Sequence, residues 1–350
     1  MNHGGDIYRN KVDIDFSVTL NPYGIPEKVA KALEYSIKRA GQYPDIRQEE
    51  VRNAIGHLTG LEKDSIYAGN GASELIQASV RAVIPKKALL FEPGFSGYAH
   101  ALKGAGCLID RHILREDNGF KITEADTESL KRDTDLVILT DPGNPSGKNL
   151  DDDILLMILE KAVRSNTTVI LDESFYFLSD RAAEGVPLRG RRLLEKYDNL
   201  IIIRSLTKLF DVPGIRIGYV LSTPSNIDKI IQQLPEWNLS VTGEEAIKAG
   251  VKVIGETDCI KQSIRLIKQE REYLAEELKG MHLTVYDSDT ACILFKGPED
   301  LYEKLLKQRL LIRDCSDFEG LKKGYYRTAV KTHADNEILI KRIRGILNGN

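Results

Sequence analysis

The sequence predicts an α/β fold with a mostly parallel sheet flanked by helices, followed by a smaller α+β domain. Short apolar runs alternate with helix-length amphipathic segments along the middle of the chain, a pattern typical of βαβ units. After about residue 235 a long charged helical segment precedes a strand-rich tail. We therefore expect an N-terminal arm over residues 1–25, a large domain over 26–240 and a small domain over 241–350.

The expected strands are short aliphatic runs, as in strands that are buried on both faces. They cover residues 87–91, 135–139, 167–171, 199–203 and 216–221, with 291–295 and 325–330 in the small domain. Helices are expected over 151–163 and 258–278. Another helix is predicted by an apolar stripe from Leu75 to Ile84, with Ser73 as its N-cap and Pro85 at its end.

Composition excludes several classes of protein. A net charge of −3 gives no electrostatic case for binding nucleic acid or an anionic membrane. The start of the chain has no apolar leader segment, and no run is long enough to span a membrane. The cysteines are scattered without a Cys-x-x-Cys pair, so we expect reduced thiols, no metal site and a cytoplasmic protein.

The most informative stretch runs from Ser205 through Lys208 to Arg216, directly after the expected strand 199–203. Ligands of open α/β sheets bind beyond the carboxyl ends of the strands. A lysine held there away from water has a lowered pKa, which frees its amine for Schiff-base chemistry. The alternative interpretation of so short a pattern is a solvated lysine and a structural arginine in an ordinary loop.

Two glycine-rich turns also have the features of a ligand-binding site. The run from Ala68 to Glu74 precedes a helix, whose N-terminal N–H groups form a ready phosphate site. The run from Thr140 to Gly147 places Asn144 before a proline at the end of a strand, where its amide could contact an anionic oxygen. An ordinary capped turn is the alternative for each.

Two charged residues sit in apolar strands. Asp172 closes the expected strand 167–171, and a buried carboxylate needs a partner such as a protonated pyridine nitrogen. Arg327 lies in the expected strand 325–330 and would suit a bidentate grip on a substrate carboxylate. The alternative for Asp172 is that it caps the next helix, and the alternative for Arg327 is that it is a solvent-exposed cation on an edge strand.

The order of these features resembles the fold type I pyridoxal-phosphate enzymes of the aspartate aminotransferase superfamily, over essentially the whole chain. Within the histidinol-phosphate aminotransferase branch, the chain looks most like the L-threonine-O-3-phosphate decarboxylases of cobalamin biosynthesis. The segments that carry this closer resemblance are His3-Gly-Gly, Asp15 to Gly24, Tyr43-Pro-Asp45, Glu92-Pro-Gly-Phe95, Leu310 to Cys315 and Gly324 to Arg327.

The resemblance implies a role for each matching residue. Lys208 would bind pyridoxal 5′-phosphate covalently and move protons, and Asp172 would pair with the pyridine N–H. Cofactor contacts are implied for Ala72, Ser73, Ser205 and Arg216 at the phosphate, Tyr98 on the ring face, Asn144 at the phenolic oxygen, and Tyr43 from the neighbouring subunit of a homodimer. Substrate contacts are implied for Arg327, Arg313, Asn144, His3 and Asn21.

One departure bears on the reaction. Transaminases of the superfamily usually have tyrosine three residues after the strand-terminal aspartate, whereas this chain has Phe175, as the decarboxylase relatives do. Loss of that hydroxyl changes the electronics of the cofactor. The bond at Cα that breaks is the one held perpendicular to the cofactor plane. Which bond takes that orientation depends on where the two ends of the substrate are bound.

The expected function is therefore decarboxylation of a phosphorylated amino acid, with L-threonine O-3-phosphate first and phosphoserine as a close neighbour. Histidinol-phosphate aminotransferase, or a related class I/II aminotransferase, is the alternative. A non-enzymatic alternative is the effector-binding module of a transcription regulator. That role requires a DNA-binding domain, for which no residues are expected before the arm.

Overall fold

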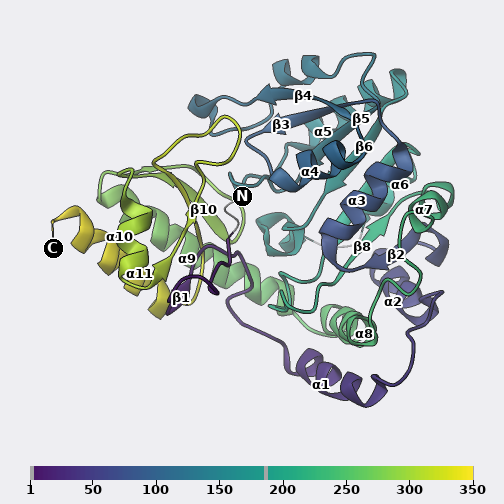
Figure 1. Ribbon diagram of the computed structural model, residues 1–350, viewed down its shortest axis with the longest axis horizontal. Helices are drawn as coiled ribbons and strands as arrows, with labels where there is room; N and C mark the ends of the chain where they lie inside the picture. The colour runs from purple at the N-terminus through teal and green to yellow at the C-terminus, as the bar shows by residue number, and fades with distance from the viewer. Residues whose placement is uncertain (1–3, 185–187, 350) are drawn as a thin grey trace.

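The computed structural model describes residues 4–184 and 188–349. Within them, a sheet of seven strands in the order β2-β8-β7-β6-β5-β3-β4 forms the centre of the larger unit (Figure 1). Strands β3 to β7 run parallel to one another, whereas β8 is antiparallel to both of its neighbours. The mostly parallel sheet that the sequence predicts is confirmed.

The strands are β1 (Ile14–Asp15), β2 (Ile66–Gly69), β3 (Lys87–Glu92), β4 (Leu108–Ile113), β5 (Leu136–Thr140), β6 (Thr168–Asp172), β7 (Leu200–Ser205), β8 (Gly218–Leu221), β9 (Thr284–Val285), β10 (Cys292–Lys296), β11 (Leu310–Leu311), β12 (Arg313–Asp314) and β13 (Tyr325–Ala329). The helices are α1 (Glu27–Ser36), α2 (Glu49–Thr59), α3 (Gly71–Val83), α4 (Ser96–Gly104), α5 (Asp152–Arg164), α6 (Leu188–Leu194), α7 (Pro224–Ile231), α8 (Val241–Glu256), α9 (Cys259–Gly280), α10 (Leu301–Lys307) and α11 (His333–Leu347).

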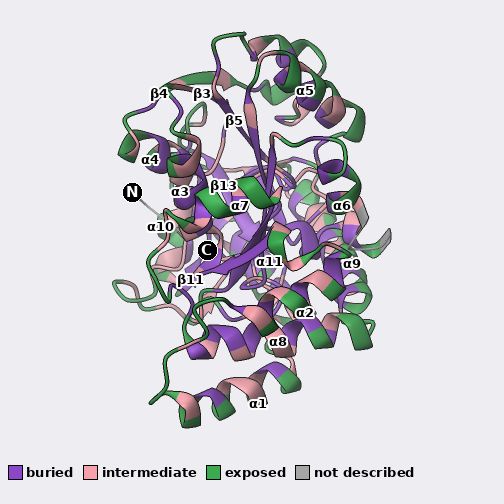
Figure 2. Ribbon diagram, turned by 90° about the vertical axis from the view of Figure 1, so that its right-hand side faces the viewer, coloured by how far each residue is buried: buried purple, intermediate pink, exposed green. Residues whose placement is uncertain are grey.

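The central strands are buried on both faces, which explains their continuous apolar sequences. Alternate residues enter separate apolar layers, because successive side chains of a strand point to opposite faces. Leu89 and Val137 belong to the layer on one face, and Leu90 and Ile138 to the layer on the other. Figure 2 shows the buried strands inside a partly exposed shell of helices.

Helix α3 begins earlier than the sequence predicts. Asn70 occupies the N-cap position, and Ser73 lies inside the first turn, so the expected Ser73 cap is wrong. The Glu74 carboxylate instead reaches back and accepts the Asn70 N–H at 2.7 Å. A glutamate early in the helix thus satisfies the N–H of the residue before it, which would otherwise lack an acceptor. The N–H groups of the first turn therefore start at Gly71.

The smaller unit has a four-stranded antiparallel sheet in the order β12-β13-β10-β9, counted over the described residues. Helices α9, α10 and α11 enclose a separate apolar core with this sheet. The N-terminal arm docks on this unit, since β1 pairs with β11 and Phe16 accepts the Ala329 N–H at 2.7 Å. The arm is thus the link that carries N-terminal residues toward the junction of the two units.

Helix α8 packs against α1 and α2, which belong to the larger unit. Helix α9 begins three residues after α8 ends; it contacts β9, β10 and α11 of the smaller unit, and also the segments 176–178 and 180–184 of the larger unit. We therefore propose that the boundary between the domains lies near residue 257 and not near residue 240, so that α8 belongs to the larger unit.

In the described parts of the chain, the model contains no helix that is both long and apolar enough to cross a lipid bilayer. Nor do the described residues contain a cluster of three or more histidine, cysteine, aspartate or glutamate side chains that could hold a metal ion.

Replacement of Gly250 in α8 is predicted to lower stability. A Cβ at Gly250 would lie 2.2 Å from Phe210 Cε2. Gly250→Ala should therefore lower the free energy of unfolding by about 1–3 kcal/mol, because overpacking outweighs the better helix propensity of alanine. The control is Gly255→Ala in the same helix, where no described atom lies within 4 Å of the new Cβ. Thermal unfolding should show a lower midpoint for the first variant only; equal shifts would contradict this packing argument.

Candidate active site

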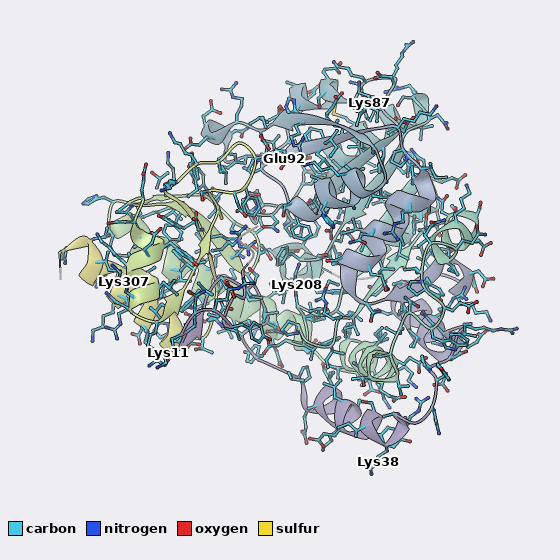
Figure 3. The ribbon with its side chains drawn as sticks, viewed as in Figure 1. Lys11, Lys38, Lys87, Glu92, Lys208 and Lys307 are labelled. Carbon is cyan, nitrogen blue, oxygen red and sulfur yellow. The ribbon has the colours of Figure 1, made fainter. Side chains whose placement is uncertain are left out.

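The carboxyl ends of three adjacent parallel strands converge on one cavity between the two units, where Lys208 lies (Figure 3). Thr140 ends β5, Asp172 ends β6 and Ser205 ends β7, and the register places Thr140 beside Asp172. The cavity has a volume of about 420 Å³. Other residues that line it include Gly4, Ser17, Val18, Thr19, Ala72, Ser73, Phe95, Tyr98, Asn144, Ser174, Phe175, Thr207, Lys208, Arg216, Arg313, Phe318 and Arg327.

The Lys208 amine is held away from bulk water. Its Nζ lies 3.5 Å from the centroid of the Phe175 ring. Burial lowers the pKa of Lys208 to about 8, although the nearby Asp172 carboxylate acts in the opposite direction. An amine with this pKa is partly unprotonated near neutral pH and can act as a nucleophile or a base.

Asp172 is a buried carboxylate that can accept further hydrogen bonds. Its Oδ1 accepts the Ser174 N–H at 2.8 Å, and its Oδ2 accepts the Tyr98 hydroxyl at 2.7 Å. The Tyr98 hydroxyl also lies 2.9 Å from Thr140 Oγ1. Burial and the adjacent carboxylate raise the pKa of Tyr98 well above its ordinary value, so it stays a donor. Each carboxylate oxygen has a second lone pair for a cationic N–H from the cavity.

The start of α3 and Arg216 form a phosphate cradle. Ala72 and Ser73 lie in the first turn of α3, whose N–H groups and dipole favour an anion. Gly71 has a φ of +78°, and its Cβ would lie 2.8 Å from Arg216 Nη2; a Cβ at Gly218 would lie 2.8 Å from the Arg204 carbonyl oxygen and 3.2 Å from the Ala72 nitrogen. Glycine is therefore required at both positions for β8, Arg216 and the helix start to approach so closely.

Arg327 and Asn144 meet across the junction of the two units. Arg327 Nη1 donates to Asn144 Oδ1, and Nη2 donates to the Ser17 carbonyl oxygen at 3.0 Å. Arg327 Nε is buried without a hydrogen-bond partner among the described residues. A buried guanidinium N–H without an acceptor favours an anionic ligand such as a carboxylate.

Arg313 is a second guanidinium of the smaller unit that lines the cavity. It is held in place by Asp317, whose Oδ1 accepts from Nη2 at 2.7 Å, and by the Asp314 carbonyl oxygen. The Phe318 ring centroid lies 5.1 Å from Arg313 Cζ. The cavity therefore contains a separate cationic group beside Arg327.

Some sequence-predicted residues do not reach this cavity. The Asn21 amide donates to the Leu209 carbonyl oxygen at 2.8 Å and to Ser263 Oγ at 2.9 Å, so its side chain fastens the arm to the body of the protein. Tyr43 is 81% exposed and lies 5.2 Å from Trp237, measured between ring centroids. His3 lies outside the described residues.

Sequence reasoning missed several residues that line the cavity. Thr140 carried a signal, because it ends β5 in the same register at which Asp172 ends β6. Phe95 ends the Glu92-Pro-Gly-Phe95 run, which carries part of the resemblance but has no chemical group that predicts a role. Thr19 and Phe318 gave no signal, since only tertiary packing brings the arm and the 313–318 segment to the cavity.

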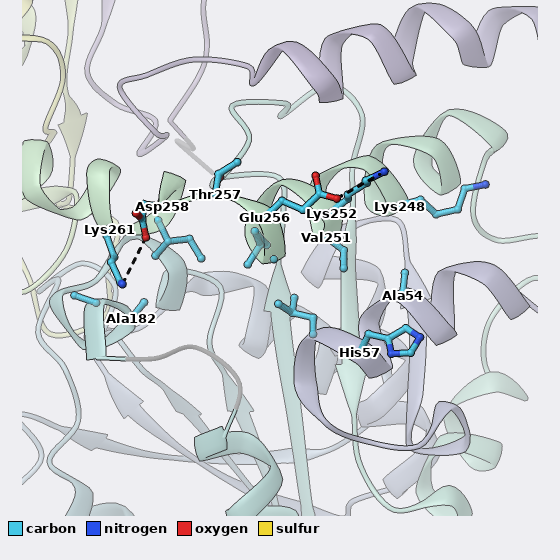
Figure 4. A pocket seen from close by; sticks show the side chains of 15 residues that line it. Ala54, His57, Ala182, Lys248, Val251, Lys252, Glu256, Thr257, Asp258 and Lys261 are labelled. Carbon is cyan, nitrogen blue, oxygen red and sulfur yellow. Dashed lines mark ion pairs between the residues drawn. The ribbon is translucent and has the colours of Figure 1, made fainter.

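A larger groove of about 810 Å³ lies away from these residues, between α2, α8 and the start of α9 (Figure 4). Its lysines are already engaged: Lys252 pairs with Glu256 at 3.7 Å and Lys261 with Asp258 at 3.5 Å. Size alone does not indicate chemistry, so we assign the active site to the smaller cavity that contains Lys208.

Comparison with known proteins defines the class. The model of the family "Aminotransferase class I and II" matches residues 11–343. A putative threonine-phosphate decarboxylase of Caldanaerobacter subterraneus is 34% identical, over 98% of this chain and 93% of that protein. The threonine-phosphate decarboxylase of Salmonella typhimurium is 30% identical, over 96% of this chain and 92% of that protein.

Among solved structures, the histidinol-phosphate aminotransferase from Clostridium acetobutylicum superimposes with a TM-score of 0.87 at 30% identity, covering 96% of this chain and all of that one. The chain belongs to the aminotransferase class I and II family. It has the fold of the fold type I enzymes, and its cofactor is pyridoxal 5′-phosphate.

The donor set of the cavity fits this cofactor. The start of α3, the Ser205 hydroxyl and Arg216 would hold the phosphate, and Asp172 would accept the pyridine N–H. Lys208 is the amine available for covalent attachment. These assignments, with Tyr98 against the ring and Asn144 at the phenolic oxygen, stay predictions.

The phosphate cradle can be tested without substrate. Gly218→Ala should raise the dissociation constant of pyridoxal phosphate about tenfold or more, because the new Cβ would collide with the Arg204 carbonyl oxygen of β7 and crowd the Ala72 nitrogen of α3, which displaces these backbones from one another. The control is Gly214→Ala, where a Cβ meets no described atom within 4 Å. Titration of the cofactor-free variants, followed by absorbance, measures both constants. Equal affinity in the two variants would contradict the cradle.

Proposed function

We propose that the protein decarboxylates a phosphorylated amino acid, with L-threonine O-3-phosphate as the substrate and aminopropanol phosphate as the product, in cobalamin biosynthesis. The observation that carries this proposal is the presence of both Arg327 and Arg313 in the cavity of Lys208. A substrate with a carboxylate at one end and a phosphate at the other can occupy both guanidinium groups. Relatives at 34% and 30% identity are named for threonine phosphate, which has both groups.

The two arginines would also select the reaction. We infer that Arg327, with its unpartnered Nε, binds the carboxylate and that Arg313 binds the phosphate. When bound, pyridoxal phosphate withdraws electrons from Cα. The separation of the two anionic ends then fixes the orientation of the bonds at Cα, so that the bond to the carboxylate is the one weakened.

Lys208 and Phe175 are suited to the remaining proton transfer. After loss of CO₂, Cα requires a proton, and an amine with a pKa of about 8 can hold one and deliver it near neutral pH. Phe175 places an aromatic face against Lys208 Nζ, and it lacks the hydroxyl that a tyrosine would have at the far end of the ring. The cavity therefore has one donor fewer beside the lysine than the transaminases that have tyrosine at this position.

We also propose that the active site is shared between two copies of the chain. Tyr43 and Trp237 form an exposed aromatic pair outside the cavity of their own chain. Ile37 and Ile46, on either side of Tyr43 in sequence, are 75% and 43% exposed. Such apolar exposure is typical of an interface. A second copy would cover these side chains and receive Tyr43 at its cofactor phosphate, with Ser73 and Arg216.

The reaction can be assigned with two substrates. The purified holoenzyme, given threonine phosphate without an oxo acid, should release CO₂ and aminopropanol phosphate over many turnovers. Threonine without the phosphate is the control substrate. Arg313→Gln should raise KM for threonine phosphate about tenfold or more, because a hydrogen bond to a charged group contributes about 1.5–3 kcal/mol.

The alternative, histidinol-phosphate aminotransferase, predicts a different result in the same assay. Amino transfer from histidinol phosphate to 2-oxoglutarate, without CO₂ release from threonine phosphate, would overturn the proposed decarboxylation. Lys208→Ala is the control for both reactions and should abolish the visible absorbance of the bound cofactor as well as activity.

A further inference from the structure

A cluster of buried charges lies next to the residues that face the cavity, at the carboxyl ends of the three strands that form it. Thr140, Asp172 and Ser205 line the cavity, whereas the adjacent Asp141 and Glu173 do not. The residue before Ser205, Arg204, is likewise outside it. This division follows from the geometry of strands, in which successive side chains point to opposite faces.

These charges form one continuous network. Arg204 Nε lies 2.7 Å from Glu173 Oε2, and both side chains are fully buried. Glu173 Oε1 lies 2.8 Å from Arg189 Nη1, and this nitrogen lies 2.8 Å from Asp141 Oδ2. Arg181 Nη1 also lies 2.8 Å from Asp141 Oδ2. The network therefore crosses the ends of β5, β6 and β7.

The network also holds the loop that carries Asn144. Asp141 Oδ1 accepts the Leu150 N–H at 2.9 Å, and Arg181 Nη2 donates to the Leu150 carbonyl oxygen at 2.7 Å. These contacts close the loop between β5 and α5 at its base. The main chain adds to this support, because the Glu173 N–H donates to the Ile203 carbonyl oxygen at 2.8 Å.

The charge of the network is nearly balanced. The buried acids Glu173 and Asp141 face Arg204, Arg189 and Arg181, and the more exposed Asp152 lies 3.0 Å from Arg189 Nη2. Buried ion pairs contribute little net stability compared with apolar residues of similar size, although breaking one side is costly. Fold stability alone therefore does not account for so many charges beneath the strand ends.

We propose that Glu173, held between Arg204 and Arg189, is a positioning residue that fixes Asp172, Ser205 and the Asn144 loop relative to one another for the proposed reaction. Glu173 directly follows Asp172, and Arg204 directly precedes Ser205, so one ion pair fastens the ring-binding and phosphate-binding strand ends together. The part of the inference that concerns catalysis rests on the proposed function; the part that concerns cofactor geometry needs only the cofactor.

The test compares two variants of the network with a control variant of a buried carboxylate elsewhere in the protein. Glu173→Gln removes one charge, and Arg204→Lys keeps the charge but loses the Nε–H that donates to Glu173 Oε2. The control is Glu270→Gln in α9, a buried carboxylate that accepts from His333 and Asn336 of the smaller unit. Each holoenzyme is titrated with pH, and the midpoint of its visible cofactor absorbance is measured.

Both network variants should change this midpoint by about half a pH unit or more, whereas Glu270→Gln should leave it unchanged even if it unfolds at a lower temperature. With threonine phosphate, kcat should fall about tenfold or more while KM changes less than about threefold, since Arg313 and Arg327 are intact. If a variant fails to fold, Arg189→Lys, at the residue that joins Glu173 to Asp141, carries the same test.

Unchanged midpoints and unchanged kcat in the network variants would overturn the inference, whatever their loss of thermal stability. Failure of the proposed function is distinguishable, because the absorbance midpoint requires no substrate. If the wild-type enzyme does not decarboxylate threonine phosphate but the midpoints shift as expected, the positioning role stands and the substrate assignment falls.

Discussion

The burial of the Lys208 amine opposite Asp172 is the interaction on which the rest of the site depends. A fully solvated lysine would be almost entirely protonated at neutral pH, so little free amine would be available to attack a carbonyl group. Here burial against Phe175 lowers the lysine pKa, while Asp172 limits the decrease. The same carboxylate is kept in place by the Ser174 N–H and the Tyr98 hydroxyl. The cavity therefore contains a reactive amine and an anion at fixed positions.

The parallel sheet makes this arrangement possible. Carboxyl ends of adjacent parallel strands meet at one edge, so Thr140, Asp172 and Ser205 converge although they are far apart in sequence. The smaller unit and the N-terminal arm then close the opposite side with Arg327 and Arg313. In the proposed function, the larger unit would supply the groups for the cofactor, and the smaller unit would supply the cations for a substrate with two anionic ends.

Local patterns in the sequence were sufficient to predict the strands β3, β5, β6 and β7, because buried parallel strands are short continuous apolar runs. The order of motifs placed Lys208, Asp172, Asn144, Arg216 and Arg327, and the structure brings all of them to one cavity. The sequence did not predict the cap of α3, which depends on the reach of Glu74. Nor did it predict the use of Asn21 to hold the arm, or the Glu173–Arg204 pair. These depend on long-range contacts that local patterns do not encode.

The state of the Lys208 amine tests the account most directly. Isotope-labelled lysine in the cofactor-free enzyme, titrated by NMR with Lys208→Arg to assign the signal, measures its protonation. Burial disfavours the charged form, so the account predicts half-protonation near a pH of about 8. A midpoint at the ordinary lysine value of 10.5 would contradict the central claim, because the amine would then be a solvated cation.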